Sequence, residues 1–314
     1  MGRLGCDGRR IRPPRFRLSR HDQAPALPRC RAVSAGRRPG APAAAIPVTG
    51  VVQPAGSTPI PDGPAQAWIV ADMDTGEVLA ARGEHEAHAP ASTIKVLLAT
   101  VVLDELPLDA TIVANDADTR VECNCAGVAA GRTYTTRQLL EGLLLVSGND
   151  AANTLATMLG GRDVAVQKMN AKAAMLGAHG TSAGSPSGID GPGIDIRSTP
   201  HDLAAIFRAA MANPIFAQIT AQPTAVFPAK SGDVVLVNQN ELLHRYPGAF
   251  GGKTGYTDLA RKTYVGGAHR GGRHLVVALM YGLVAEGGPT YWDQAGALLD
   301  WGFALGPHAG VSRL

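Results

Sequence analysis

A serine and a lysine stand three residues apart at Ser92 and Lys95, shortly after Pro90. The apolar stretch from Ser92 to about Glu105 predicts a helix, and side chains at i and i+3 lie on one helical face. A serine hydroxyl is a weak nucleophile until a base takes its proton, and a lysine amine becomes such a base when burial and nearby cations lower its pKa. The pair predicts nucleophilic catalysis, although a helix-capping serine beside a solvent-facing lysine has the same spacing.

Two further segments carry polar side chains suited to the same chemistry. Ser147 and Asn149 follow a predicted buried helix, where a serine could relay a proton and an asparagine could hold a substrate amide or the lysine. Lys253 and Thr254 offer a positive charge and a hydroxyl to a carboxylate, and Gly255 lets another backbone approach. Taken singly, the two segments also fit a helix C-cap with a glycine turn and a strand with a glycine bulge.

The elements that must position these residues follow from hydrophobic periodicity and turn signals. Strands are predicted at 67–71, 78–81, 234–237, 249–256, 262–268 and 274–281. Helices are predicted at 92–105, 135–147, 150–159, 164–176, 199–211 and 290–305, with a Gly/Pro/Ser-rich loop at 182–193. Thr135 and Gln138 form a predicted capping box. This order predicts an α+β domain: an antiparallel sheet from both chain ends, flanked by helices, with a helical lobe inserted.

Charge divides the chain near residue 62. Residues 1–62 hold 11 Arg, no Lys and 3 acidic residues, whereas the remainder holds 18 basic and 23 acidic residues. The pI near 8.7 is therefore a property of the leading segment, and we do not expect the folded part to bind nucleic acid. Because residues 1–62 are rich in Arg, Pro, Gly and Ala without periodicity, we predict a disordered leader there and one catalytic domain at 63–314.

Export signals in the leading segment are incomplete. The chain has no run of 18 apolar residues, so no membrane span is predicted. Residues 43–45 could be a signal cleavage site, but Arg29, Arg31, Arg37 and Arg38 interrupt the place of the apolar stretch. The sequence therefore predicts an unusual leader or, slightly favoured, a misplaced start codon.

The cysteines predict no metal centre. Cys123 and Cys125 are two residues apart, and no second Cys/His pair follows at ligand spacing. They are interpreted as loop or strand thiols or as a local disulfide.

Together, S-x-x-K, S-x-N and K-T-G in this order form the signature of penicillin-recognising serine enzymes. The chain resembles the low-molecular-weight penicillin-binding D-alanyl-D-alanine carboxypeptidases, with an actinobacterial character, over about residues 65–305. The matching segments are 71–79, 91–95, 144–152, 188–190, 198–204, 238–240 and 251–258. Because the chain ends soon after Leu305, we expect it to lack the C-terminal β-rich domain and membrane anchor of some relatives.

The resemblance implies a β-lactamase/transpeptidase-like fold and an extracytoplasmic enzyme of peptidoglycan biosynthesis. Such an enzyme removes the terminal D-Ala from stem peptides ending in D-Ala-D-Ala, is inhibited by β-lactams and needs no cofactor. It implies that Ser92 is the acylated nucleophile, Lys95 its base and Ser147 a proton relay. The substrate-binding residues that it implies are Asn149, Lys253, Thr254, Gly255 and Tyr256, and the oxyanion hole consists of the N–H groups of Ser92 and Tyr256.

Three other functions fit parts of the pattern. A β-lactamase of class A uses a glutamate between the second and third motifs for deacylation, but no glutamate occurs from Gly142 to Asn240. A non-catalytic penicillin-binding sensor usually loses a motif residue, and none is lost here. A DD-endopeptidase or transpeptidase shares the acyl-enzyme, so the motifs do not separate it from a carboxypeptidase.

Overall fold

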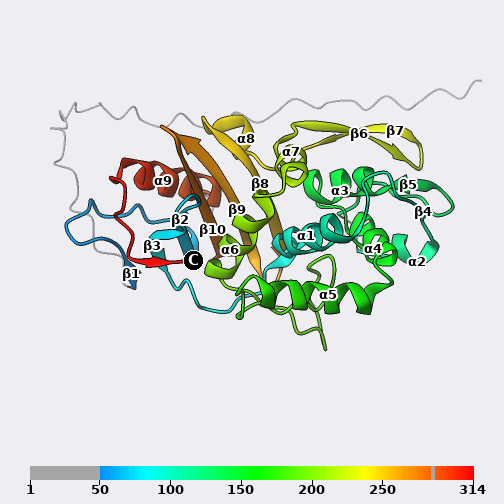
Figure 1. Cartoon of the computed structure of the whole chain (residues 1–314), viewed down its shortest axis with the longest axis horizontal. Coiled ribbons are helices and arrows are strands. Elements are labelled where there is room, and N and C mark those ends of the chain that lie inside the picture. Colours follow the sequence, from blue (N-terminus) through cyan, green and yellow to red (C-terminus); the bar gives the residue numbers. More distant parts are fainter. Residues whose placement is uncertain (1–49, 123, 284–286) are drawn as a thin grey trace, which may run out of the picture. The chain divides into compact units, whose positions relative to one another are not determined.

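The structure, a computed structural model, describes residues 50–122, 124–283 and 287–314. Its framework is an antiparallel sheet with strand order β1-β3-β2-β10-β9-β8, in which β11 also pairs with β3. The strands of this sheet are β1 (Val51–Val52), β2 (Ala65–Asp72), β3 (Glu77–Arg82), β8 (Ala249–Thr257), β9 (Arg261–Arg270), β10 (Arg273–Gly282) and β11 (Ser312–Arg313). Both ends of the described chain contribute strands, which confirms the predicted α+β sheet (Figure 1).

Most of the helices lie in the long segment between β3 and β8. They are α1 (Lys95–Glu105), α2 (Asp116–Thr119), α3 (Thr136–Leu145), α4 (Asn149–Met158), α5 (Arg162–Met175), α6 (Pro200–Met211), α7 (Pro214–Ala221) and α8 (Leu242–Arg245), and α9 (Tyr291–Ala304) follows β10. Two small hairpins lie among them, formed by β4 (Thr111–Val113) with β5 (Thr133–Thr135) and by β6 (Thr224–Ala229) with β7 (Gly232–Val237). This is the predicted helical lobe, although α2, α7, α8, β4, β5 and β6 were not predicted from the sequence.

Alternate side chains of β2 enter two different cores, because neighbouring residues of a strand point to opposite faces. Ile69 belongs to the core that includes Phe207 of α6 and Phe216 of α7. Trp68 belongs to the core that includes Leu298 of α9. The sheet is thus covered by helices on both faces (Figure 1).

No single helix in the described ranges is long and apolar enough to cross a membrane. Helices α6 and α7 reach the required length and composition only as a pair, and that pair is bent by 105°.

Local signals in the sequence set several helix ends. Thr135 and Gln138 form the predicted capping box: Gln138 N donates to Thr135 Oγ1 at 3.2 Å, and Thr135 N donates to Gln138 Oε1 at 2.9 Å. Thr290 caps α9 in the same way, with Asp293 as its partner. These side chains satisfy N–H groups that have no partner within their own helix.

Folded structure begins before the predicted boundary at residue 62. Val51 and Val52 of β1 pair with β3, and the Trp301 indole of α9 donates to the Thr58 carbonyl oxygen at 2.8 Å. Ile60 is buried in the core beneath α9. The segment escaped prediction because two residues are too few to show a period. The predicted disorder of residues 1–49 lies outside the described residues.

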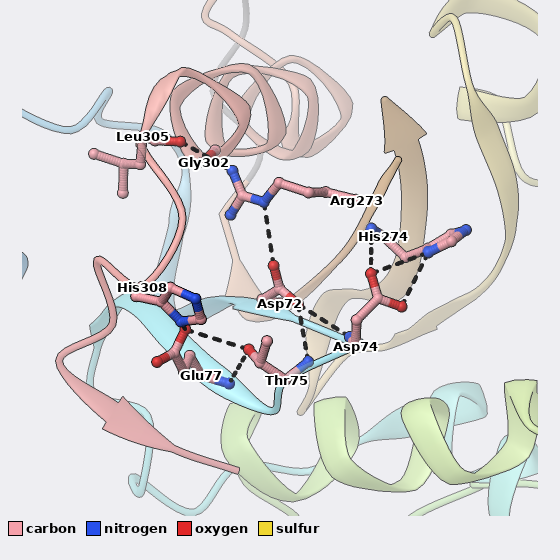
Figure 2. Close-up of polar contacts among 9 residues, drawn as sticks. All are labelled: Asp72, Asp74, Thr75, Glu77, Arg273, His274, Gly302, Leu305 and His308. Atoms are coloured by element: carbon pink, nitrogen blue, oxygen red, sulfur yellow. Dashed lines mark hydrogen bonds and ion pairs between the residues drawn. The ribbon is translucent and has the colours of Figure 1, made fainter. Parts of the chain in front are cut away.

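One arginine links the turn between β2 and β3 to the end of α9 (Figure 2). Arg273 pairs with Asp72 at 3.2 Å and donates to the Leu305 carbonyl oxygen at 2.9 Å. The other carboxylate oxygen of Asp72 accepts hydrogen bonds from the nitrogens of Asp74 and Thr75, each at 3.0 Å. Arg273 therefore connects the β2–β3 turn, the start of β10 and the C-terminus of α9.

Candidate active site

Ser92 lies in a 3-10 turn, Ala91–Ile94, that leads into α1. The spacing had predicted an α-helix starting at Ser92; the α-helix begins only at Lys95. Ala91 has φ of 48°, a left-handed conformation that non-glycine residues rarely adopt. Thr263 of β9 donates from Oγ1 to the Pro90 carbonyl oxygen at 2.9 Å and so ties this turn to the sheet.

Lys95 is fully buried, with its amine against the Ser92 hydroxyl. Its Nζ lies 2.8 Å from Ser92 Oγ and 2.6 Å from Asn149 Oδ1. Ser147 Oγ is 3.4 Å from the same nitrogen. Burial, and after it the charge of Lys253, lowers the pKa of Lys95 well below its usual value. An amine held neutral in this way can accept the proton of Ser92.

Ser147 lies in the turn between α3 and α4, and Asn149 lies at the start of α4. The sequence analysis extended the first helix to Ser147, but α3 ends at Leu145 and Ser147 has φ of 61°, outside the helical region. Asn149 is the first residue of α4; its Nδ2 donates to the Glu122 carbonyl oxygen at 2.7 Å. That bond fixes the amide orientation, so the amide oxygen faces Lys95.

The third motif lies on β8, beside the nucleophile turn. Lys253 is buried, and burial lowers its pKa to about 7. Its Nζ donates to the Thr254 carbonyl oxygen at 2.8 Å. A β-carbon on Gly255 would lie only 2.9 Å from the Ser92 nitrogen, so glycine permits the close approach of the strand. The Tyr256 side chain is half exposed at the cleft.

A cleft of about 590 Å³ joins these segments. Six of the predicted site residues line it, namely Ser92, Ser147, Asn149, Thr254, Gly255 and Tyr256. Lys95 and Lys253 lie buried beside this lining. The structure thus brings all eight predicted residues into one site.

The predicted loop at 182–193 forms one wall of the cleft. Ser92 Oγ lies 3.3 Å from the Ser187 carbonyl oxygen, and Thr257 Oγ1 donates to Asp190 Oδ2 at 2.5 Å. Gly188 has φ of 87°, and a β-carbon there would lie 2.1 Å from the Ala91 carbonyl oxygen. The loop is therefore in direct contact with the nucleophile turn.

Sequence analysis missed several lining residues, among them Glu122, Asn124, Glu241, Lys262 and Tyr291. Glu122 and Asn124 contact Asn149 through backbone carbonyl oxygens, which every residue type carries, so their sequence gives no signal. Cys125, next to it, is disulfide-bonded, and the other three cysteines lie outside the described residues. Within the described ranges, no three His, Cys, Asp or Glu side chains are grouped as metal ligands would be.

Comparison with known proteins gives concordant matches. Residues 54–282 match the sequence model of the peptidase S11 family, described as D-alanyl-D-alanine carboxypeptidase. The D-alanyl-D-alanine carboxypeptidase DacB2 of Mycobacterium tuberculosis is 71% identical over 263 residues, which cover 84% of this chain and 90% of that protein. The crystal structure of a D-alanyl-D-alanine carboxypeptidase from the same organism matches with a TM-score of 0.82 at 71% identity, covering 84% of this chain and 100% of that one.

A more distant structure shares the fold. The crystal structure of the Streptomyces K15 DD-transpeptidase matches with a TM-score of 0.73 at 31% identity, covering 78% of this chain and 99% of that chain. These matches confirm the predicted fold class and the predicted serine-type hydrolase. The chain belongs to the D-alanyl-D-alanine carboxypeptidase family, whose members act on peptidoglycan peptides in the cell envelope and bind β-lactams.

Proposed function

We propose that this chain releases the terminal D-alanine of peptidoglycan stem peptides through an acyl-enzyme on Ser92. The observation that supports this most strongly is the buried Lys95 amine 2.8 Å from the Ser92 hydroxyl. As Ser92 Oγ attacks the carbonyl carbon between the two D-alanines, Lys95 takes its proton. The N–H groups of Ser92 and Tyr256 receive the oxyanion, and one such donor is typically worth about 3–4 kcal/mol.

The proton taken from Ser92 returns to the leaving group. Ser147, 3.4 Å from Lys95 Nζ, passes it to the nitrogen of the departing D-alanine as the C–N bond breaks. A water molecule then attacks the ester carbon while Lys95 again acts as base. This second step releases the shortened peptide and restores the Ser92 hydroxyl, so the net reaction consumes one water.

The terminal carboxylate of the substrate fits the third motif. Lys253 supplies a positive charge from below the cleft, and Thr254 lies on the cleft wall beside it. Asn149, whose orientation is fixed by its contacts, positions the peptide. A penicillin offers a strained amide and a carboxylate in similar places, so it acylates the same serine. Because peptidoglycan lies outside the cytoplasmic membrane, the proposal places the mature enzyme in the cell envelope.

The direct test is D-alanine release from an N-acyl-D-Ala-D-Ala peptide by the full chain. We expect release in the wild type and its loss in Ser92→Ala and in Lys95→Met, which keeps the length of the side chain. Lys230→Met, at an exposed lysine, is the matched control and should retain release. A folded wild type that releases no D-alanine would contradict the proposal.

Transpeptidation is a second candidate, because a structure of the same fold at 31% identity is described as a DD-transpeptidase. Its acyl-enzyme is identical, and an amine replaces water as the acceptor. The two reactions are separated by adding a glycine-terminated peptide amine to the same assay. A peptide ligated to the acceptor would favour transpeptidation, whereas free shortened peptide would favour hydrolysis.

The lifetime of the penicillin adduct distinguishes a β-lactamase from a carboxypeptidase. The missing glutamate between the second and third motifs predicts a slow deacylation, although Glu122 and Glu241 line the cleft. We expect the adduct to outlast many turnovers of the peptide reaction. Rapid penicillin turnover that is lost in Glu241→Gln would instead indicate a β-lactamase.

A further inference from the structure

Asp150 is a buried carboxylate next to Asn149 to which the proposed mechanism gives no role. It is 2% exposed and lies in the first turn of α4. Three of its hydrogen bonds come from the backbone N–H groups of residues 126–128, at 2.8 to 2.9 Å, and a fourth comes from Ala151 N at 2.8 Å. An ionised carboxylate has about four acceptor sites, so all of them are occupied.

The segment that Asp150 holds is the one that orients Asn149. The Glu122 carbonyl oxygen accepts from Asn149 Nδ2, and the Asn124 carbonyl oxygen accepts from Asn149 N, both at 2.7 Å. Asn149 Oδ1 in turn accepts from Lys95 Nζ at 2.6 Å. A chain of contacts therefore runs from the Asp150 carboxylate through the backbone of residues 124–128 to Asn149, and from Asn149 to the amine of Lys95.

The contact between Asp150 and this segment is tightly packed. A β-carbon on Gly148 would lie 2.8 Å from Asp150 Oδ1 and 3.0 Å from Ala126 N. Gly148 has φ of −55°, which alanine adopts without strain, so only the lack of space excludes a side chain there. A methyl group at this position would therefore push the carboxylate and the segment apart without removing the charge.

Asp150 is also a negative charge that acts on the buried Lys95. Burial and the charge of Lys253 lower the pKa of Lys95, whereas the charge of Asp150 acts in the opposite direction and raises it. Both lysines are fully or almost fully buried. Removal of the carboxylate would therefore alter the proton affinity of Lys95 as well as the position of the segment.

We propose that Asp150 is a positioning residue for the reaction. By gathering the N–H groups of residues 126–128, it holds the carbonyl oxygens of Glu122 and Asn124 where they turn the Asn149 amide toward Lys95. This inference rests on the proposed function, because it assigns Asp150 an effect on the Ser92 acylation. If Asp150 only stabilised the N-terminus of α4 through the helix dipole, its removal would be expected to affect the stability of that helix alone.

The test compares Asp150→Asn with Asp118→Asn in the full chain. Asp118 is a matched control because it is also buried and also accepts a backbone N–H, from Asn115 at 3.2 Å. It contacts Thr157 of α4 at 2.6 Å, away from Lys95. The readouts are the second-order rate constant of acylation by a fluorescent penicillin, measured across pH, and the folded fraction measured by circular dichroism.

For Asp150→Asn we expect acylation at least tenfold slower per folded molecule. The acid limb of the pH profile should move to lower pH, since loss of the carboxylate lowers the pKa of Lys95. Asp118→Asn should lose stability but keep both the rate per folded molecule and the position of the limb. The proposal is overturned if a folded Asp150→Asn retains both, or if the two variants lose rate equally with an unmoved limb.

Gly148→Ala keeps the proposal testable if Asp150→Asn does not fold. It should slow acylation at least tenfold while leaving the acid limb near its wild-type position, because the charge remains; an unchanged rate would overturn the proposal.

Hydrogen exchange of the 126–128 amides in the free protein is a readout independent of catalysis. Their exchange should be at least tenfold faster in Gly148→Ala and in folded Asp150→Asn than in the wild type. If the wild type shows no acylation that Ser92→Ala abolishes, the proposed function fails, while exchange still decides the role of Asp150.

Discussion

Two buried lysines in one site must hold opposite protonation states to perform the proposed reaction. Lys95 has to be neutral to accept the Ser92 proton, and Lys253 has to be charged to hold a carboxylate. Burial lowers the pKa of both lysines, and the positive charge of Lys253 lowers the pKa of Lys95 further. Lys95 is the lysine expected to be neutral, because its pKa is lowered by the charge of Lys253 as well as by burial.

The pH dependence of kcat/KM follows from these two groups. Activity should rise with pH as Lys95 loses its proton, and it should fall above about pH 7 as Lys253, whose pKa is about 7, loses its own. The alkaline limb of kcat should lie at higher pH, since a bound carboxylate stabilises the protonated lysine.

Replacement of Lys253 by arginine tests the alkaline limb, because a guanidinium stays protonated in proteins. Lys253→Arg should lose the fall above pH 7 even if its maximal rate is lower. Lys230→Arg, at an exposed position, should keep the wild-type profile. An alkaline limb that stays in place in Lys253→Arg would show that another group titrates there.

The sequence predicted those site residues whose side chains have distinctive functional groups. It did not predict the residues that contribute only backbone carbonyl oxygens. Ser92, Lys95 and Lys253 have functional groups that few residue types share, so spacing and order reveal them. Glu122 and Asn124 contribute carbonyl oxygens, which are common to all residues. Their contribution depends on a fold that brings them to Asn149, so no local pattern predicts it.

At the scale of elements, the 182–193 loop is a wall of the cleft that packs directly against the nucleophile turn, with no room for a β-carbon at Gly188. Gly188→Ala should slow acylation at least a hundredfold, because its β-carbon would overlap the Ala91 carbonyl oxygen and displace the turn. The left-handed φ adds about 1–2 kcal/mol of strain. Acylation by a fluorescent penicillin measures the effect.

Gly193→Ala is the matched control for this loop. Gly193 also has a left-handed φ, of 78°, but nothing lies within 4 Å of its β-carbon position. It should lose about 1–2 kcal/mol of stability from strain alone and keep its rate of acylation. Equal slowing in the two variants would mean that the contact with Ala91 is not what matters.

The missed elements show which local signals were misleading. β6 contains Pro228, which argues against a strand, yet among the described strands β6 pairs with β7 alone, in a hairpin where a missing donor is tolerated. Helix α7 begins with Asn213 as N-cap and Pro214 as its first residue, which is a helix start signal. The apolar run that follows is too short to predict a helix by itself. By contrast, the capping box at Thr135 is purely local and was predicted correctly.

The link made by Arg273 joins elements that are distant in sequence (Figure 2). Arg273→Ala should lower the free energy of unfolding by about 2–3 kcal/mol, the range of lost hydrogen bonds to a charged group. Arg270→Ala, at the end of β9 across the β9–β10 turn from Arg273, removes an ion pair between half-exposed side chains and should cost less than about 1 kcal/mol. Urea denaturation measures both, and equal losses would contradict the assigned role of Arg273.

At the scale of the whole molecule, the sheet depends on residues from both chain ends. A fragment of residues 63–314 lacks the β1 pairing, the Thr58–Trp301 hydrogen bond and the buried Ile60 that a fragment of residues 50–314 keeps. The shorter fragment should therefore melt at a lower temperature, by about 2–4 °C for each kcal/mol lost. Identical melting temperatures would place the true domain boundary at residue 63.

The most direct test of the central claim is to locate the penicillin adduct by mass spectrometry of the digested full chain. We predict one adduct with the mass of the intact penicillin, on Ser92, and its absence in Ser92→Ala, which should also lose D-alanine release. An adduct on another residue, or D-alanine release that survives Ser92→Ala, would contradict the account.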